Sequence, residues 1–273
     1  MSMRLGFIGV GNMGTALLKG IVGSGFIAPL NINIYDVDHR KTAALREETG
    51  VRVLGGNKEV VENSDIIILA VKPAYIGQAL EECRGSFGKS KILVSIAVGV
   101  SKITIKDIIG EDVKVVRTMP NIPVTVGEGM TLISYDANLS REEKEAVKKL
   151  FECSGKAEEL EERLMSEVTA LTGSSPAYVF VFIEAMADAA VLSGIPRNLA
   201  YRLASQAVLG SAKMVMESGL HPGELKDQVC SPAGTTIEAI NALEKNGFRY
   251  AVMDAMNECT KKAREIGNKA SGK

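Results

Sequence analysis

The chain has 273 residues, of which 46% are apolar, and its 32 basic and 33 acidic residues leave a formal net charge of -1. This length fits two domains of ordinary size. The balanced charge argues against a nucleic-acid partner, and the presence of only two histidines argues against a His-based metal site or a Ser-His-Asp triad, so we expect no metal.

The first 160 residues alternate short apolar runs with amphipathic stretches. The runs rich in Ile, Val and Leu are predicted to be strands buried on both faces. They cover Arg4–Ile8, Asn31–Tyr35, Ile66–Ala70, Ile92–Ile96, Val113–Arg117 and Met130–Ser134. The stretches between and after them are predicted to be helices at Met13–Ser24, Asp38–Thr49, Ala74–Cys83, Lys102–Ile109 and Ser140–Cys153. Such alternation predicts an α/β fold with a Rossmann-type, doubly wound parallel sheet.

A G-x-G-x-x-G motif lies between the first strand and the first helix, at Gly9, Gly11 and Gly14. Gly9 permits a tight turn, Gly11 lets backbone N–H groups approach a pyrophosphate, and Gly14 lets the helix pack on the strand. A glycine-rich turn without a ligand is the alternative. The motif's position at the start of a βαβ series favours a dinucleotide site.

The ends of the following strands supply further cofactor candidates. Asp36 is a candidate to accept bonds from a ribose 2′-hydroxyl, as NAD requires, whereas His39, Arg40 and Lys41 are candidates to meet a 2′-phosphate. For His39 and Lys41, a solvated helix start without a ligand is the alternative. Small residues after later strands leave room for nicotinamide, and Asn121 is a candidate to line the same crevice. The expected cofactor contacts are Gly9, Gly11, Asn12, Met13, Gly14, Tyr35, Asp36, Ala70, Val71, Lys72, Pro73, Ala97 and Gly99.

From Arg163 onward the sequence predicts helices alone. They cover Arg163–Thr172, Pro176–Ser193, Arg197–Ser218, Pro222–Val229, Thr235–Lys245 and Tyr250–Ile266. We therefore predict a dinucleotide-binding domain at residues 1–163 and an all-helical domain at residues 164–273.

The predicted helix over Pro176–Ser193 is apolar nearly all round. Its apolar stretch Ala177–Ile183 falls well short of the ~20 residues that a membrane span needs, so no membrane association is expected. A helix apolar on every side is buried on every side, which favours burial against a second copy of the chain. A central helix of a monomer is the alternative.

The segment Ser231–Thr236 joins two predicted helices with small residues. Free backbone N–H groups ahead of a helix form a cradle suited to a carboxylate, and Thr235 or Thr236 is expected to be the N-cap. A capped turn between helices, without a ligand, is the alternative.

In these motifs the sequence resembles the pyrroline-5-carboxylate reductase family. The matching motifs are G-F-I-G-V-G-N-M-G (6–14), A-V-K-P (70–73), S-I-A-V-G-V (95–100), M-P-N-I-P (119–123), T-G-S-S-P-A-Y (172–178) and H-P-G-E-L-K-D-Q-V-C-S-P-A-G-T-T-I (221–237). They occur in the family's order. Ser175 and Ala233 stand where the family commonly has Gly.

The resemblance implies hydride transfer from NADPH, or alternatively NADH, to the C=N bond of 1-pyrroline-5-carboxylate, giving L-proline. It implies that Thr236 is the catalytic contact, bonding the ring nitrogen or the carboxylate, and that Ser231, Gly234 and Thr235 complete the substrate loop. It also adds Asn57 to the cofactor contacts, supports Lys72 there, and implies a homodimer through the helical domain, built into a decamer of five dimers.

Two other functions suit the same fold. A β-hydroxyacid dehydrogenase would need a lysine in the helix after residues 172–178, and residues 176–192 contain none. A non-catalytic regulator that senses dinucleotides is the second alternative, against which the intact Ser231–Thr236 segment argues. The four cysteines lack C-x-x-C spacing and the N-terminus is predicted to be a strand rather than a signal peptide, so a cytoplasmic location is expected.

Overall fold

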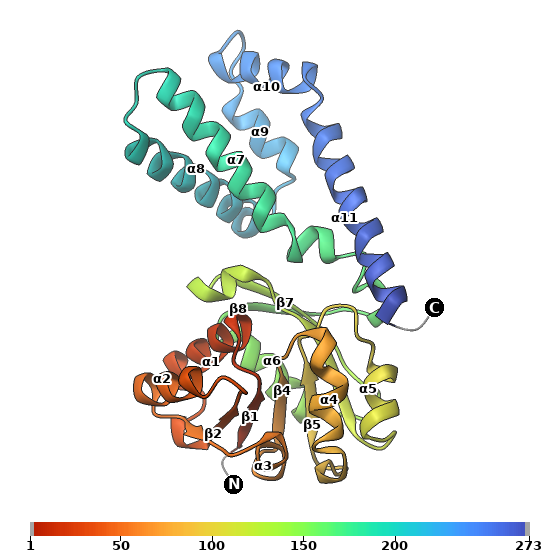
Figure 1. Ribbon diagram of the computed structural model, residues 1–273. Coiled ribbons are helices and arrows are strands. Elements are labelled where there is room, and N and C mark those ends of the chain that lie inside the picture. Colours follow the sequence, from red (N-terminus) through yellow and green to blue (C-terminus); the bar gives the residue numbers. More distant parts are fainter. Residues whose placement is uncertain (1–2, 271–273) are drawn as a thin grey trace. The chain divides into compact units, whose positions relative to one another are not determined.

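The computed structural model describes residues 3–270, and their contacts divide the chain into two compact units (Figure 1). The first unit runs to Gly173 and resumes at Thr260, and the second covers Ser174–Cys259. These bounds follow from compactness. The division of functions after residue 163 stays a prediction.

The first unit is built on an eight-stranded sheet. The strands are β1 (Leu5–Ile8), β2 (Ile32–Tyr35), β3 (Arg52–Val53), β4 (Ile66–Leu69), β5 (Ile92–Ser95), β6 (Lys114–Met119), β7 (Gly129–Ser134) and β8 (Gly155–Glu159). Their spatial order is β3-β2-β1-β4-β5-β6-β7-β8, with β6 and β7 antiparallel and the other neighbours parallel. Since β1 lies between β2 and β4, the direction of winding reverses beside it, as in a doubly wound Rossmann sheet.

Helices cover both faces of this sheet (Figure 1). They are α1 (Asn12–Ser24), α2 (His39–Thr49), α3 (Asn57–Glu62), α4 (Ile76–Glu81), α5 (Lys102–Ile109) and α6 (Arg141–Glu152). Alternate residues of β4 enter different apolar clusters: Ile66 and Ile68 pack with α1 and α6 residues, whereas Ile67 and Leu69 pack with residues of α3, α4 and α5. This double burial is why the strands lack polar alternation in sequence.

Several elements differ from the sequence prediction. The helix predicted over Ala74–Cys83 begins as a 3₁₀ turn at Pro73–Tyr75 and becomes α4. The helix predicted over Arg163–Thr172 is replaced by a 3₁₀ turn at Glu162–Leu164 and a π-helical turn at Thr169–Gly173. The elements β3, α3 and β8 were not predicted, because the first two are short and β8 is a polar edge strand that buries Ala157 and exposes most of its length.

The second unit is helical. It holds α7 (Ser175–Leu192), α8 (Arg197–Ser218), α9 (Pro222–Val229), α10 (Thr235–Lys245) and the start of α11 (Phe248–Ala270). The apolar side chains of α7 are largely exposed in the single chain, with Phe180 60% and Val181 65% accessible. Among the described residues, α7 is the one helix whose length and composition would allow it to cross a membrane, a test that the core helix of a soluble protein also passes.

Candidate active site

The glycine loop after β1 is shaped by close packing. Gly9 has a φ of +89°, which favours glycine, and its N–H donates to the Tyr35 carbonyl at 2.8 Å. A Cβ on Gly14 would lie 2.9 Å from the Gly9 carbonyl oxygen. Both positions therefore require glycine to bring α1 against the loop, as the sequence predicts.

Gly11 differs, because it faces open space. A Cβ built there would meet no heavy atom within 4 Å. Gly11 is also the N-cap of α1, and no side chain of the described residues caps that helix. The first-turn N–H groups thus keep the hydrogen-bonding capacity that a pyrophosphate uses at a helix N-terminus, so the loop fits a dinucleotide.

Asp36 braces this loop from the end of β2. Its Oδ2 accepts from the Val10 N–H at 2.8 Å, and its Oδ1 accepts from the Asp38 N–H at 2.9 Å. Both carboxylate oxygens are thus committed to backbone groups. In the structure, Asp36 therefore stabilises the backbone of the glycine loop and of the turn after β2. The contact with a ribose 2′-hydroxyl that the sequence suggests stays a prediction.

The three basic residues after Asp36 have different surroundings. The His39 ring meets the Tyr35 ring edge-on, with centroids 6.2 Å apart. The Arg40 side chain is 93% exposed and reaches Asp38 at 3.4 Å. Lys41 lines the cleft described next.

A cleft of about 450 Å³ opens beside the glycine loop. It collects many of the expected cofactor residues, namely Gly9, Gly11, Tyr35, Asp36, Asn57, Ala70, Val71 and Lys72. Asn12, Met13, Gly14 and Pro73 are not among its lining residues, and Ala97 and Gly99 line a separate small cavity with Arg117 and Ser166. The cleft is also lined by Val37, Tyr75, Gln78, Ala79 and Glu82, which sequence reasoning did not single out.

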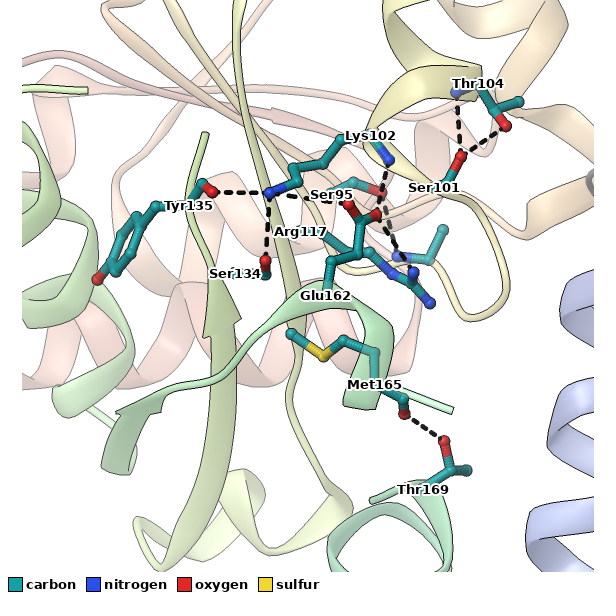
Figure 2. Close-up of polar contacts among 11 residues, drawn as sticks. Ser95, Ser101, Lys102, Thr104, Arg117, Ser134, Tyr135, Glu162, Met165 and Thr169 are labelled. Atoms are coloured by element: carbon teal, nitrogen blue, oxygen red, sulfur yellow. Dashed lines mark hydrogen bonds and ion pairs between the residues drawn. The ribbon is translucent and has the colours of Figure 1, made fainter. Parts of the chain in front are cut away.

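An ion-pair network holds the loop that follows β5, where Ala97 and Gly99 lie (Figure 2). The Glu162 carboxylate accepts from the backbone N–H of Lys102 at 2.9 Å and from the Arg117 guanidinium at 3.3 Å. The Lys102 ammonium donates to the Tyr135 carbonyl at 2.7 Å and to Ser134 Oγ at 3.2 Å. The network fixes the start of α5. No local sequence motif predicts it, because its members are distant in sequence.

Asn121 has a structural role in the described fold. Its Nδ2 donates to the Thr172 carbonyl at 3.0 Å, and its Oδ1 accepts from the Met130 N–H at 2.8 Å. Its amide therefore ties the loop after β6 to β7 and to the π-helical turn. The expectation that Asn121 lines the cofactor crevice stays a prediction beside this structural role.

The Ser231–Thr236 segment forms a tight turn at the start of α10. The Gly234 N–H donates to the Ser231 carbonyl at 3.0 Å, and Ala233, between them, has a φ of +55°. A Cβ on Gly234 would lie 2.2 Å from Ser231 Oγ, so that hydroxyl occupies the space a side chain would need.

The N-cap of α10 corrects one expectation. It is Gly234, without a side-chain cap among the described residues, whereas Thr235 and Thr236 are the first two residues of the helix itself. The helix start therefore presents N–H groups without a side-chain acceptor, next to the Ser231 and Thr236 hydroxyls. This donor set suits a carboxylate.

Comparison with known proteins covers both units. Residues 162–266 match a family model described as pyrroline-5-carboxylate reductase dimerisation, and residues 4–99 match one described as NADP oxidoreductase coenzyme F420-dependent. The chain is 47% identical over 266 residues to a pyrroline-5-carboxylate reductase of Escherichia coli K12, covering 97% of this chain and 99% of that one. It is 44% identical to the enzyme of that name from Methanosarcina acetivorans, covering 98% and 99% of the two chains.

A solved structure agrees with these relatives. The Plasmodium falciparum pyrroline carboxylate reductase with NADP bound superposes with a TM-score of 0.87 at 35% identity, covering 97% of this chain and 98% of that one. The resemblance inferred from the motifs is confirmed, and the match to a dimerisation model shows that the chain forms homo-oligomers. The chain belongs to the pyrroline-5-carboxylate reductase family, whose members are NAD(P)H-dependent oxidoreductases acting on a C=N bond.

Proposed function

We propose that the two uncapped helix starts divide the reaction between them: the N-terminus of α1 holds the pyrophosphate of NADPH, and the N-terminus of α10 holds the carboxylate of 1-pyrroline-5-carboxylate. When bound, NADPH supplies the hydride that reduces the C=N carbon, and a proton on the ring nitrogen completes L-proline. The observation that carries this proposal is the pair of glycine N-caps, Gly11 and Gly234, each without a side-chain cap in the described chain.

On the cofactor side, the residues that line the cleft support a direct assignment. Gly9 and Gly11 approach the pyrophosphate, with the N–H groups of Asn12, Met13 and Gly14 completing the helix start. Six lining residues surround the remaining cofactor at the ends of β2 and β4 and the start of α3, namely Tyr35, Asp36, Asn57, Ala70, Val71 and Lys72. Pro73, which follows Lys72 at the start of a 3₁₀ turn, is assigned with them. Ala97 and Gly99, in the loop held by Glu162, are assigned to the nicotinamide end.

NADPH is favoured over NADH on this reading of the cleft. The carboxylate of Asp36 is already used by the N–H groups of Val10 and Asp38, which weakens it as an acceptor for a free 2′-hydroxyl. Lys41 lines the same cleft and offers a cation to a 2′-phosphate. The NADP-bound relative supports the same preference.

On the substrate side, the backbone N–H groups of Thr235 and Thr236 are assigned to the carboxylate, and Gly234, whose own N–H bonds the Ser231 carbonyl, lets the backbone come close to it. Ser231 supports the turn by filling the space beside Gly234. The Thr236 hydroxyl then bonds the ring nitrogen or the carboxylate and orients the C=N bond for hydride transfer. Orientation suffices as a catalytic role, because a protonated imine is already electrophilic and solvent can supply the proton.

The finer assembly and location follow from composition and surface. The exposed apolar residues of α7 support a homodimer through the helical domain. The decamer of five dimers rests on the family resemblance alone. Burial of α7 by a partner accounts for its apolar surface without a membrane. The net charge of -1 speaks against nucleic acid, and the reduced cysteines favour the cytoplasm.

The test combines turnover with two variants of one residue. Purified protein given 1-pyrroline-5-carboxylate and NADPH is expected to consume the cofactor and form proline. Thr236→Ala should lower kcat by at least ~10-fold, about the ~1.4 kcal/mol of one hydrogen bond in the transition state, while Thr236→Ser should retain most activity. Absence of turnover with either cofactor would overturn the proposal, and an unchanged Thr236→Ala rate would remove Thr236 from the site.

A further inference from the structure

Asn57 and Glu82, which lie outside the sequence motifs, form a hydrogen-bonded pair of side chains that lines the cofactor cleft. Asn57, the first residue of α3, is 8% exposed, and its Nδ2 donates to Glu82 Oε2 at 2.7 Å. Glu82 follows directly after α4, and its Oε1 accepts from Gln78 Nε2 at 3.3 Å. All three side chains line the cleft.

The chemistry of this pair fixes the direction of the Asn57 amide. An ionised carboxylate only accepts hydrogen bonds, so Glu82 selects the NH₂ side of the amide and turns the carbonyl side away from itself. Among the described residues, no donor is bonded to Asn57 Oδ1. The side-chain atoms that are both fully buried and without a partner do not include Asn57 Oδ1, so this oxygen is not shut off from the cleft. The result is an accessible acceptor on a side chain that lines the cleft.

We propose that Glu82 is a positioning residue: it locks the Asn57 amide so that Oδ1 accepts a hydrogen bond from a hydroxyl of the dinucleotide. This inference rests on the proposed function, because it assumes that the cleft holds the cofactor. Glu82 acts through Asn57 and bonds no part of the cofactor itself.

The charge of Glu82 supports an indirect role. A carboxylate in a cleft that takes a phosphate-bearing ligand repels that ligand, so a direct electrostatic contribution of Glu82 would weaken binding. The side-chain amides of Asn57 and Gln78 donate hydrogen bonds to the Glu82 carboxylate and so stabilise its negative charge. Lys41 and Lys72, which line the same cleft, carry the opposite charge. The two roles thus predict opposite effects when the charge is removed.

Glu82→Gln separates these effects while keeping the side-chain shape. The amide of Gln can accept or donate a hydrogen bond, so it no longer selects one orientation of the Asn57 amide. We expect the Kd for NADPH, measured by fluorescence titration without substrate, to rise about 5-fold, with a parallel rise in KM for NADPH and kcat within about 2-fold. The matched control is Glu81→Gln, since Glu81 is exposed and pairs with Arg84 at 3.6 Å, and it should leave both constants unchanged.

A double-mutant cycle tests whether Glu82 acts through Asn57. Asn57→Ala alone should weaken NADPH binding, and adding Glu82→Gln to it should cause no further loss, because the locked group is gone. Thermal melting checks that each variant is folded, and Asn57→Ser replaces Asn57→Ala if the latter does not fold.

The outcomes separate this inference from the proposed function. Additive losses, or a Glu82→Gln variant that binds NADPH as well as or better than the unmodified protein, would overturn the positioning role while leaving the reductase intact. An unmodified protein that fails to bind NADPH would overturn both.

Discussion

At the residue scale, backbone geometry shapes both candidate anion sites. Gly11 leaves open space above the start of α1, and Gly234 leaves room for the Ser231 hydroxyl at the start of α10. Neither site needs a charged side chain at its centre, since helix N-termini carry partial positive charge. This accounts for a chain that handles anionic ligands with a net charge of -1.

Ala233 carries strain that a glycine would relieve. Its φ of +55° lies in the left-handed region, where a Cβ is unfavourable. Ala233→Gly should raise the free energy of unfolding by about 0.5–1 kcal/mol, measured by urea denaturation at fixed protein concentration. The control Ala239→Gly, in the exposed interior of α10, should lower stability instead by about 1 kcal/mol. Equal destabilisation by both variants would contradict strain at 233.

Cys83 makes stability depend on alkaline pH. Its burial, aided by the charge of Glu82, raises the pKa of the thiol to about 12. In the unfolded chain the thiol titrates near ~8.5, so unfolding releases a proton between these values. The stability that the neutral thiol contributes is therefore complete below pH ~8.5 and declines as pH rises toward 12.

The measurement compares the unmodified protein with Cys83→Ala, which has no titrating group at this position. The stability advantage of the unmodified protein should shrink between pH 8 and pH 10 in matched denaturation experiments. A gap that stays constant over this range would show that the thiol titrates alike in both states.

At the element scale, the success of sequence prediction follows from burial. Strands such as β4 and β5 were predicted because both faces are apolar, which leaves a continuous Ile, Val and Leu run. The sequence does not predict strand β8, because most of its side chains are polar and exposed. It does not predict helix α3, because six residues are too few to show a helical period. The glycine loop and the Ser231–Thr236 segment carry local signals, whereas Asn57 entered only through the family resemblance.

Contacts between elements that are distant in sequence could not be predicted from the sequence. Glu162 meets Lys102 and Arg117 only after β5, β6 and the 3₁₀ turn at Glu162–Leu164 are in place. Glu82 likewise meets Asn57 across two helices. Neither pairing follows a recognisable spacing in the sequence, because the partners come together only when the sheet forms.

Glu162→Gln should loosen the loop between β5 and α5. The change leaves Arg117 and Lys102, whose side chains are 13% and 14% exposed, without a full counter-charge. We expect a loss of about 1–2 kcal/mol in the free energy of unfolding, along with a higher KM for NADPH, because Ala97 and Gly99 lie in the loop. Glu161→Gln is the matched control, since Glu161 pairs with Arg163 on the exposed surface. Similar effects of both changes would refute a specific role for the network.

At the scale of the whole molecule, the two units differ in how they bury apolar surface. The first unit encloses two large apolar clusters between its sheet and its helices, whereas α7 and α8 leave most of their large apolar side chains exposed in the single chain. Exposed apolar surface of this extent marks an association site. The match of residues 162–266 to a dimerisation model supports association with other copies of the chain.

Phe180→Asp should therefore separate the subunits. Phe180 is 60% exposed, and a charge there would lie in the surface that a partner covers, whereas its neighbour Phe182 already packs on Phe248 within the chain at 6.1 Å between ring centroids. Sedimentation or light scattering should show a mass approaching the 29.1 kDa of one chain, with loss of reductase activity if the active site needs the assembly. Leu30→Asp is the control, since Leu30 is 71% exposed in the first unit and should leave the mass unchanged. An oligomer that survives Phe180→Asp but dissociates with Leu30→Asp would place the interface on the first unit instead.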